Sequence, residues 1–191
     1  ADDRPGDTRQ HRKSVVEVPD AESIVRSSAV HEDAGTACST SKHQKNMIPK
    51  RIHLCWLSGD PYPQKIQKCI DSWKVHLPDY EIMLWDLKRF DIAQVPWVEQ
   101  AFRVKKYAFA ADYIRLYALY NYGGIYLDSD VEVLKSFDPL LDLPYFVGAE
   151  NAGTIEAAII GAEKGCDWIK ACLDYYKGRN FIQENGQMDI R

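Results

Sequence analysis

The sequence predicts an α/β layered domain with a mostly parallel central sheet. Two patterns lead to this prediction: short apolar runs typical of strands, and segments whose apolar residues recur at intervals of three and four, as in helices. The two patterns alternate along the chain, which favours strands joined by helices that cover the sheet. A length of 191 residues, 46% of them hydrophobic, fits one domain of this class.

The domain is expected to span residues 48–191. Residues 1–47 contain no Phe, Trp or Tyr and are rich in Ser, Thr and charged residues, so we expect a disordered tail. The N-terminus has neither a basic start nor an apolar signal core, and no apolar run reaches the ~18 residues of a membrane span. Five cysteines without a Cys-x-x-Cys pair favour reduced thiols. We therefore expect a cytoplasmic protein.

The first strand is expected over residues 51–56, an apolar run that ends at turn-forming residues. A helix over residues 63–74 follows, because Ile66, Ile70 and Trp73 share one helical face. Residues 81–85 then form the second strand. The later elements are expected as helices over residues 97–104, 107–120 and 166–177, and as strands over residues 125–127, 131–134, 146–148 and 157–160. Gly123 and Gly124 close the long helix, where glycine can adopt the positive φ of a C-cap.

An acidic triplet, Asp128-Ser129-Asp130, follows the strand over residues 125–127. Ligands of such sheets bind at the carboxyl ends of the strands. Two carboxylates one residue apart can hold Mn²⁺ or Mg²⁺ while positions remain open for diphosphate oxygens. The spacing alone is common by chance, and a solvated turn would show it too. The triplet gains meaning from its context.

Asp112 and Arg115 supply part of that context. They are three residues apart on an otherwise apolar helix and therefore share a face. One interpretation is a structural ion pair between them. The other is that both reach the site, where Arg115 offers a bidentate fork to phosphate or sugar oxygens and Asp112 accepts hydrogen bonds from hydroxyls. His53, inside the first strand, is expected to be structural.

Several separated motifs occur in one order: residues 48–53, Trp56, residues 110–115, and residues 122–130. Together they resemble the glycosyltransferases with an Asp-x-Asp sugar-binding region. That family includes bacterial capsule and lipopolysaccharide transferases, yeast initiating mannosyltransferases and, more distantly, the clostridial glucosylating toxins. The resemblance implies a GT-A-like fold that binds a nucleotide-diphospho sugar.

The resemblance also implies a reaction: metal-dependent, retaining transfer of a hexose from a UDP- or GDP-sugar to a glycan or lipid-linked acceptor, in surface polysaccharide biosynthesis. It implies that Trp56 stacks on the nucleobase, that Asp112 and Arg115 hold the donor sugar, that Tyr126 contacts the nucleoside, that Asp128 binds donor hydroxyls and the metal, and that Asp130 ligates the metal. Asp128, Asp130 and Arg115 would be the catalytic residues. For Trp56 and Tyr126, core packing is the alternative.

The chain departs from the family at its C-terminal end, where a closing His- and Trp-containing motif is expected and Arg191 is reached first. We therefore expect a C-terminally incomplete fold, and a catalytically incomplete donor-binding fragment is one alternative function. A haloacid-dehalogenase-like phosphatase, which also places Asp-x-Asp after a strand, is the other. The net charge of −4 argues against nucleic acid as a partner. The expected location is the inner face of a bacterial membrane, in peripheral association.

Overall fold

The computed structural model describes residues 47–150 and 154–190. The predicted tail lies outside the described residues, apart from Met47. In the described part of the chain, no helix has the length and apolar character needed to cross a membrane.

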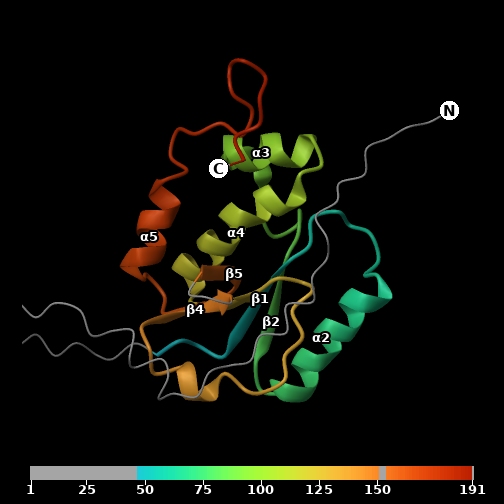
Figure 1. The fold of residues 1–191 in the computed structure, drawn as a ribbon, viewed down its shortest axis with the longest axis vertical. Coiled ribbons are helices and arrows are strands. Elements are labelled where there is room, and N and C mark those ends of the chain that lie inside the picture. Colours follow the sequence, from blue (N-terminus) through green and yellow to red (C-terminus); the bar gives the residue numbers. More distant parts are fainter. Residues whose placement is uncertain (1–46, 151–153, 191) are drawn as a thin grey trace, which may run out of the picture.

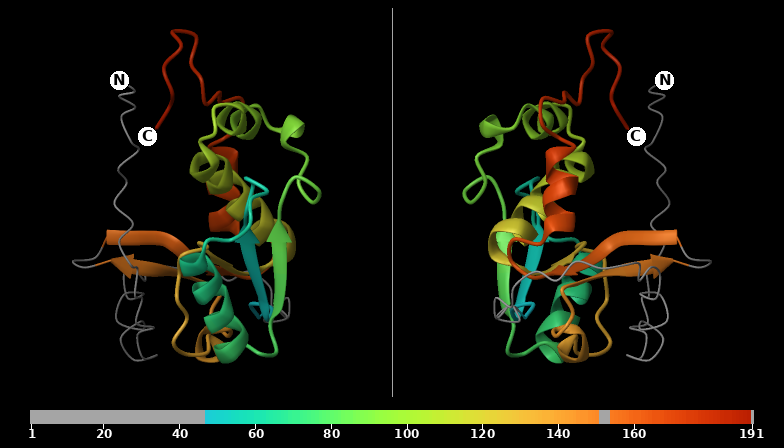
Figure 2. Two further views of the ribbon diagram at one scale, coloured as in Figure 1. Left: turned by 90° about the vertical axis from the view of Figure 1, so that its right-hand side faces the viewer. Right: turned by 90° about the vertical axis from the view of Figure 1, so that its left-hand side faces the viewer.

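Five strands form one sheet in the order β2-β1-β3-β5-β4 (Figure 1). They are β1 (Arg51–Cys55), β2 (Glu81–Trp85), β3 (Gly124–Leu127), β4 (Tyr145–Glu150) and β5 (Thr154–Ala162). Strand β1 pairs in parallel with β2 and with β3, so the centre of the sheet is parallel as predicted. Strand β5 then runs antiparallel to β3, and β4 antiparallel to β5. Figure 2 shows the β4–β5 pair, in orange, extending sideways from the rest of the sheet.

Helices cover both faces of the sheet, as expected for the layered class. They are α2 (Gln64–His76), α3 (Pro96–Arg103), α4 (Tyr107–Tyr122) and α5 (Asp167–Asp174), each close to its predicted range. Along β1, Ile52 and Leu54 pack in the core beneath α2. The intervening His53 is buried on the other face, against Trp85 of β2. This alternation follows the two-residue period of a strand.

Residues 131–134, predicted as a strand, do not join the sheet. Val131 and Val133 are buried in the core beneath α2. Their backbone groups bond to side chains of α2 instead of a neighbouring strand: the indole of Trp73 donates to the Val131 carbonyl at 2.8 Å, and the Val133 amide donates to the Ser72 hydroxyl at 2.9 Å. The apolar pattern correctly indicated burial, but burial against a helix.

Gly123 and Gly124 connect α4 to β3 with φ of +63° and +115°. A Cβ on Gly124 would lie 2.6 Å from the carbonyl oxygen of Arg51, and one on Gly123 would lie 2.7 Å from the backbone nitrogen of Lys164. Both the positive φ and the close approach require glycine. This junction seats β3 between its neighbours and thereby sets the position of Asp128.

Candidate active site

The acidic triplet forms a turn at the carboxyl end of β3. The Asp128 amide donates to the Ala158 carbonyl of β5 at 2.9 Å, and the Val131 amide closes the turn on the Asp128 carbonyl at 3.0 Å. The side chains of Asp128 and Asp130 are both partly exposed. Because β1 and β3 are parallel neighbours, the turn lies at the same edge of the sheet as the end of β1. The predicted site therefore stands where strands of this class bind ligands.

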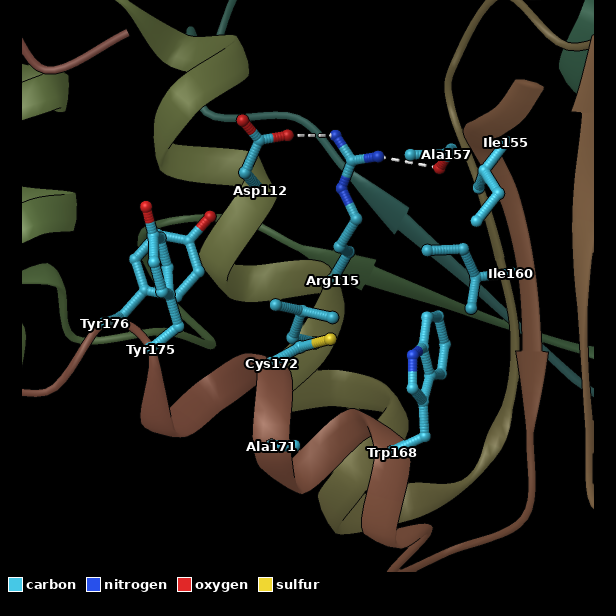
Figure 3. Close-up of a pocket in the computed structure, with 11 residues that line it drawn as sticks. Asp112, Arg115, Ile155, Ala157, Ile160, Trp168, Ala171, Cys172, Tyr175 and Tyr176 are labelled. Atoms are coloured by element: carbon cyan, nitrogen blue, oxygen red, sulfur yellow. Dashed lines mark hydrogen bonds and ion pairs between the residues drawn. The ribbon is translucent and has the colours of Figure 1, made fainter. Parts of the chain in front are cut away.

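Arg115 of α4 reaches this turn from a buried position, with a side chain that is 10% exposed. Its Nη2 forms an ion pair with Asp112 and lies 3.9 Å from Oδ1 of Asp128. Its Nη1 donates to the Ala157 carbonyl of β5 at 2.7 Å (Figure 3). The ion pair that the sequence left as a structural alternative is present, and it stands beside the acidic turn. The contacts of Asp112 and Arg115 with a donor stay predictions.

The surroundings of Arg115 stabilise its positive charge. Burial acts to lower the pKa of the guanidinium, whereas nearby Tyr126, Asp128 and Asp112 act to raise it, and the net shift is upward. The guanidinium carbon lies 4.9 Å from the centre of the Tyr126 ring, a cation–π contact. The buried Nε has no hydrogen-bond partner among the described residues. Arg115 is thus a fixed cation at the inner wall of the site.

Tyr126 of β3 is 2% exposed, and its hydroxyl donates to Oδ1 of Asp128 at 2.9 Å. Burial raises the pKa of this hydroxyl well above its usual range, so Tyr126 remains a neutral donor. Oδ1 of Asp128 therefore faces both Tyr126 and Arg115. In this structure Tyr126 acts on the site through Asp128. The nucleoside contact implied by the resemblance stays a prediction.

Trp56 follows the end of β1 and is half-buried. Its amide donates to the Trp85 carbonyl at 2.9 Å, its indole donates to the Asp60 carbonyl at 2.8 Å, and Tyr62 packs edge-on at 5.0 Å. The ring is held at the carboxyl edge of the sheet rather than in the core. Its predicted stacking on a nucleobase stays a prediction.

His53 is structural, as expected. It is fully buried, its Nδ1 accepts from the Trp85 indole at 3.0 Å, and its Nε2 lies 2.8 Å from the Gly123 carbonyl. Because an indole can only donate, the proton of the neutral ring is on Nε2. Burial lowers the pKa of His53 to about 4, against the raising effect of the Gly123 hydrogen bond. His53 therefore ties β1 and β2 to the glycine junction.

The carboxylate oxygens at the turn fit a hard divalent cation whose remaining ligands would include diphosphate oxygens. Within residues 47–150 and 154–190, no three His, Cys, Asp or Glu side chains gather as a metal site. Mg²⁺ takes one or two carboxylates and completes its shell with substrate phosphates and water. Asp128 and Asp130 supply two such carboxylates on a partly exposed turn.

A pocket of about 550 Å³ adjoins the Asp112–Arg115 pair, between α4, β5 and α5 (Figure 3). Apart from that pair, its lining is aliphatic and aromatic, with Cys172. The contribution of α5 was not predicted, because the apolar spacing of residues 166–177 marks a buried face without showing what lies against it. The Ala157 carbonyl was missed as well, since a backbone contact leaves no mark in the sequence.

Comparisons with known proteins agree with this geometry. Residues 63–147, which include Asp112, Arg115 and the acidic triplet, match the family described as glycosyltransferase sugar-binding region containing DXD motif. Inositol phosphoceramide mannosyltransferase 3 of Schizosaccharomyces pombe is 37% identical over 131 aligned residues, an alignment that covers 64% of this chain and 35% of that protein. A mannosyl phosphorylinositol ceramide synthase of Saccharomyces cerevisiae is 35% identical over 123 aligned residues, an alignment that covers 61% of this chain and 32% of that protein.

The structure of the PaToxG glycosyltransferase is similar as well, with a TM-score of 0.56 and 26% identity over 70% of this chain and 64% of that one. This similarity supports the GT-A-like fold. Together the comparisons favour a glycosyltransferase over the phosphatase alternative. The chain spans about a third of the length of the two curated fungal relatives.

Proposed function

We propose that this chain, whose residues 63–147 belong to the glycosyltransferase family with a DXD-containing sugar-binding region, transfers a hexose from a nucleotide-diphosphate sugar to an acceptor hydroxyl. One observation carries the proposal. Asp112 and Arg115 of α4, the Tyr126 hydroxyl of β3 and the Asp128 carboxylate converge at the carboxyl end of β3. Two separate parts of the sequence, α4 and the end of β3, thus build one polar cluster beside a pocket.

In this proposal each group has a role that its surroundings support. Asp112, with a side chain 39% exposed, accepts hydrogen bonds from hydroxyls of the donor sugar. Arg115 is held by its contacts and supplies positive charge near the leaving diphosphate, an electrostatic contribution that can reach several kcal/mol. Tyr126 orients Asp128. When bound by Asp128 and Asp130, Mn²⁺ or Mg²⁺ would neutralise charge on the diphosphate oxygens.

At the anomeric carbon, the net transfer makes one bond and breaks one. The acceptor hydroxyl oxygen bonds to the anomeric carbon of the sugar, and the bond from that carbon to the diphosphate oxygen breaks with its electron pair. The hydroxyl proton passes to water. We propose retention of configuration, which needs either a carboxylate nucleophile or attack from the face of the leaving group. We assign no nucleophile.

The fungal relatives also inform the donor sugar and the acceptor. Their names describe mannosyl transfer to inositol phosphoceramide, so we propose mannose as the sugar and a lipid-linked acceptor in preference to a capsular or lipopolysaccharide glycan. We further propose a cytoplasmic location at the inner face of the membrane. Its support is that Cys55, Cys69, Cys166 and Cys172 are free thiols, which is typical of a reducing compartment.

Calorimetric titration with GDP and with UDP, each with and without Mn²⁺, tests the donor site. We expect Mn²⁺ to strengthen binding of at least one nucleotide and Asp130→Ala to remove that gain. Glu132→Ala is the matched control, because Glu132 is an exposed carboxylate two residues further along the chain. Equal loss in both variants, or no nucleotide binding by the unmodified chain, would overturn the donor site.

Turnover separates the enzyme from a donor-binding fragment. Incubation with GDP-mannose, Mn²⁺ and an acceptor should release GDP and yield mannosylated acceptor. Nucleotide binding without any release of GDP, even by slow hydrolysis, would instead support the catalytically incomplete fragment.

A further inference from the structure

We propose that helix α2 positions the acidic turn, with Ser72 and Trp73 as the positioning residues for Asp130. This inference rests on the proposed transferase function, since it concerns how the metal carboxylates of that donor site are held. Both side chains act through the backbone that follows Asp130, with which each forms one hydrogen bond. Trp73 is fully buried and therefore cannot reach a ligand itself. Figures 1 and 2 both show the chain after β3, in yellow to orange, passing beside α2.

The acidic turn is anchored on two sides. On the sheet side, the Asp128 amide donates to the Ala158 carbonyl of β5 at 2.9 Å. On the other side, the chain leaves the sheet, and Val131 is held through both of its backbone groups. Its amide donates to the Asp128 carbonyl at 3.0 Å, and its carbonyl accepts from the Trp73 indole at 2.8 Å. The residue that follows Asp130 therefore depends on α2 for its orientation.

The hydroxyl of Ser72 holds the same segment two residues further along. It accepts from the Val133 amide at 2.9 Å and donates to the Cys69 carbonyl at 2.6 Å. An amide can only donate and a carbonyl can only accept, so these two partners fix the orientation of the hydroxyl. Val131 and Val133 are both buried in the core beneath α2. Helix α2 thus fixes both ends of the segment 131–133.

The position of Asp130 matters because metal binding depends on geometry. Asp128 and Asp130 are partly exposed, whereas the residues on either side of the turn, Leu127 and Val131, are buried. A binding site needs its ligating groups held to about 0.5 Å by the residues around them. A turn that loses its anchor on α2 keeps both carboxylates but no longer holds them at one spacing. Metal-dependent nucleotide binding should therefore fall while metal-free binding is retained.

Calorimetric titration with GDP and with UDP, each with and without Mn²⁺, tests the role of Ser72. Ser72→Ala removes the hydroxyl, whereas Ser72→Thr keeps one that can still bond to a carbonyl of the preceding helical turn. We expect Ser72→Ala to reduce the Mn²⁺-dependent gain in affinity about fivefold, and Ser72→Thr to stay within about twofold of the unmodified chain. Ser136→Ala is the matched control, because the Ser136 hydroxyl accepts from the Asp138 amide at 3.1 Å, outside the acidic turn.

Trp73→Phe removes the indole donor and keeps an aromatic ring in the core. Trp97→Phe is its control, since the Trp97 indole is similarly buried and donates to the Phe109 carbonyl at 3.0 Å in a separate core cluster. We expect the Mn²⁺-dependent gain to fall about fivefold in Trp73→Phe and to stay within about twofold in Trp97→Phe. Urea unfolding should show lower stability in both variants, which separates a loss of stability from a loss of metal geometry.

The outcomes separate this inference from the proposed function. If Asp130→Ala removes the Mn²⁺-dependent gain but Ser72→Ala and Trp73→Phe retain it, the positioning role alone is overturned. Equal reductions in the two control variants would overturn it as well, because they would show a general effect of stability. An unmodified chain that binds no nucleotide, or gains nothing from Mn²⁺, would overturn the donor site and this inference with it.

Discussion

Tyr126→Phe removes one hydroxyl and tests whether Tyr126 positions Asp128. The phenylalanine ring fills the same buried space and retains the contact with the Arg115 guanidinium at 4.9 Å. The lost hydrogen bond is 2.9 Å long and ends on a carboxylate, a class that contributes about 1.5–3 kcal/mol. The Asp128 side chain is 36% exposed, so water replaces part of this bond. We expect the free energy of unfolding to fall by about 1 kcal/mol.

The functional effect should be confined to the metal-dependent part of nucleotide binding. Without Tyr126, Oδ1 of Asp128 has lost one of its two neighbours and the carboxylate can rotate. We expect affinity for GDP with Mn²⁺ to fall about 5- to 10-fold, roughly 1–1.4 kcal/mol, and metal-free affinity to stay within twofold. Urea unfolding and calorimetry measure the two effects. Tyr113→Phe, on α4, is the control.

Two results would refute this reasoning. An equal fall of affinity with and without Mn²⁺ would place Tyr126 in the nucleoside site, as the family resemblance implies. A loss of unfolding free energy above about 3 kcal/mol would show that the ring and not the hydroxyl was disturbed.

Three further changes probe the surrounding structure. Arg115→Lys replaces a planar guanidinium by one ammonium, which cannot bind Asp112 and the Ala157 carbonyl together. Urea unfolding should therefore show a decrease of about 2–3 kcal/mol in the free energy of unfolding. A decrease below about 0.5 kcal/mol, as expected for the exposed Arg103→Lys, would contradict the role of the guanidinium. The pKa of His53 falls from 6.5 in the unfolded chain to about 4 in the folded one, so the unfolded state binds more protons between these values and stability must fall as the pH is lowered. Unfolding free energy should drop by about 2 kcal/mol from pH 7 to pH 5, and a His53→Gln variant that shows the same drop would exclude His53 as its cause. Trp56→Ala should abolish the quenching of tryptophan fluorescence by GDP or UDP, and persistent quenching would disprove base stacking.

The sequence predicted most of the fold because helical spacing and apolar runs are local signals. The face of α2 marked by Ile66, Ile70 and Trp73 is the face that packs on the sheet. The same signals do not show which element a buried segment packs against. Residues 131–134 look like a strand because Val131 and Val133 are buried, but their hydrogen bonds go to α2. The antiparallel direction of β5 against β3 likewise depends on a pairing between segments distant in sequence.

The site was predicted where its residues lie close together in the chain. Asp112 and Arg115 are one helical turn apart, so spacing showed that they share a face, and Asp128 was considered because it follows a predicted strand. Tyr126 was named only through the family resemblance. The contact between α4 and the turn after β3 is tertiary, and sequence spacing cannot show it. The 3.9 Å separation between Arg115 Nη2 and Asp128 Oδ1 illustrates this, because it joins α4 to the turn after β3.

Because β3 and β5 pair in one antiparallel register, an insertion or deletion in β5 disturbs the site more than a substitution at position 157 does. Arg115 is anchored by the carbonyl of Ala157, a residue whose own side chain is exposed. Substitutions at position 157 leave that carbonyl in place. One residue inserted into β5 would shift its pairing, so that a different backbone group would face the guanidinium. Variant libraries of this protein should therefore tolerate replacements at position 157 and few insertions or deletions in β5.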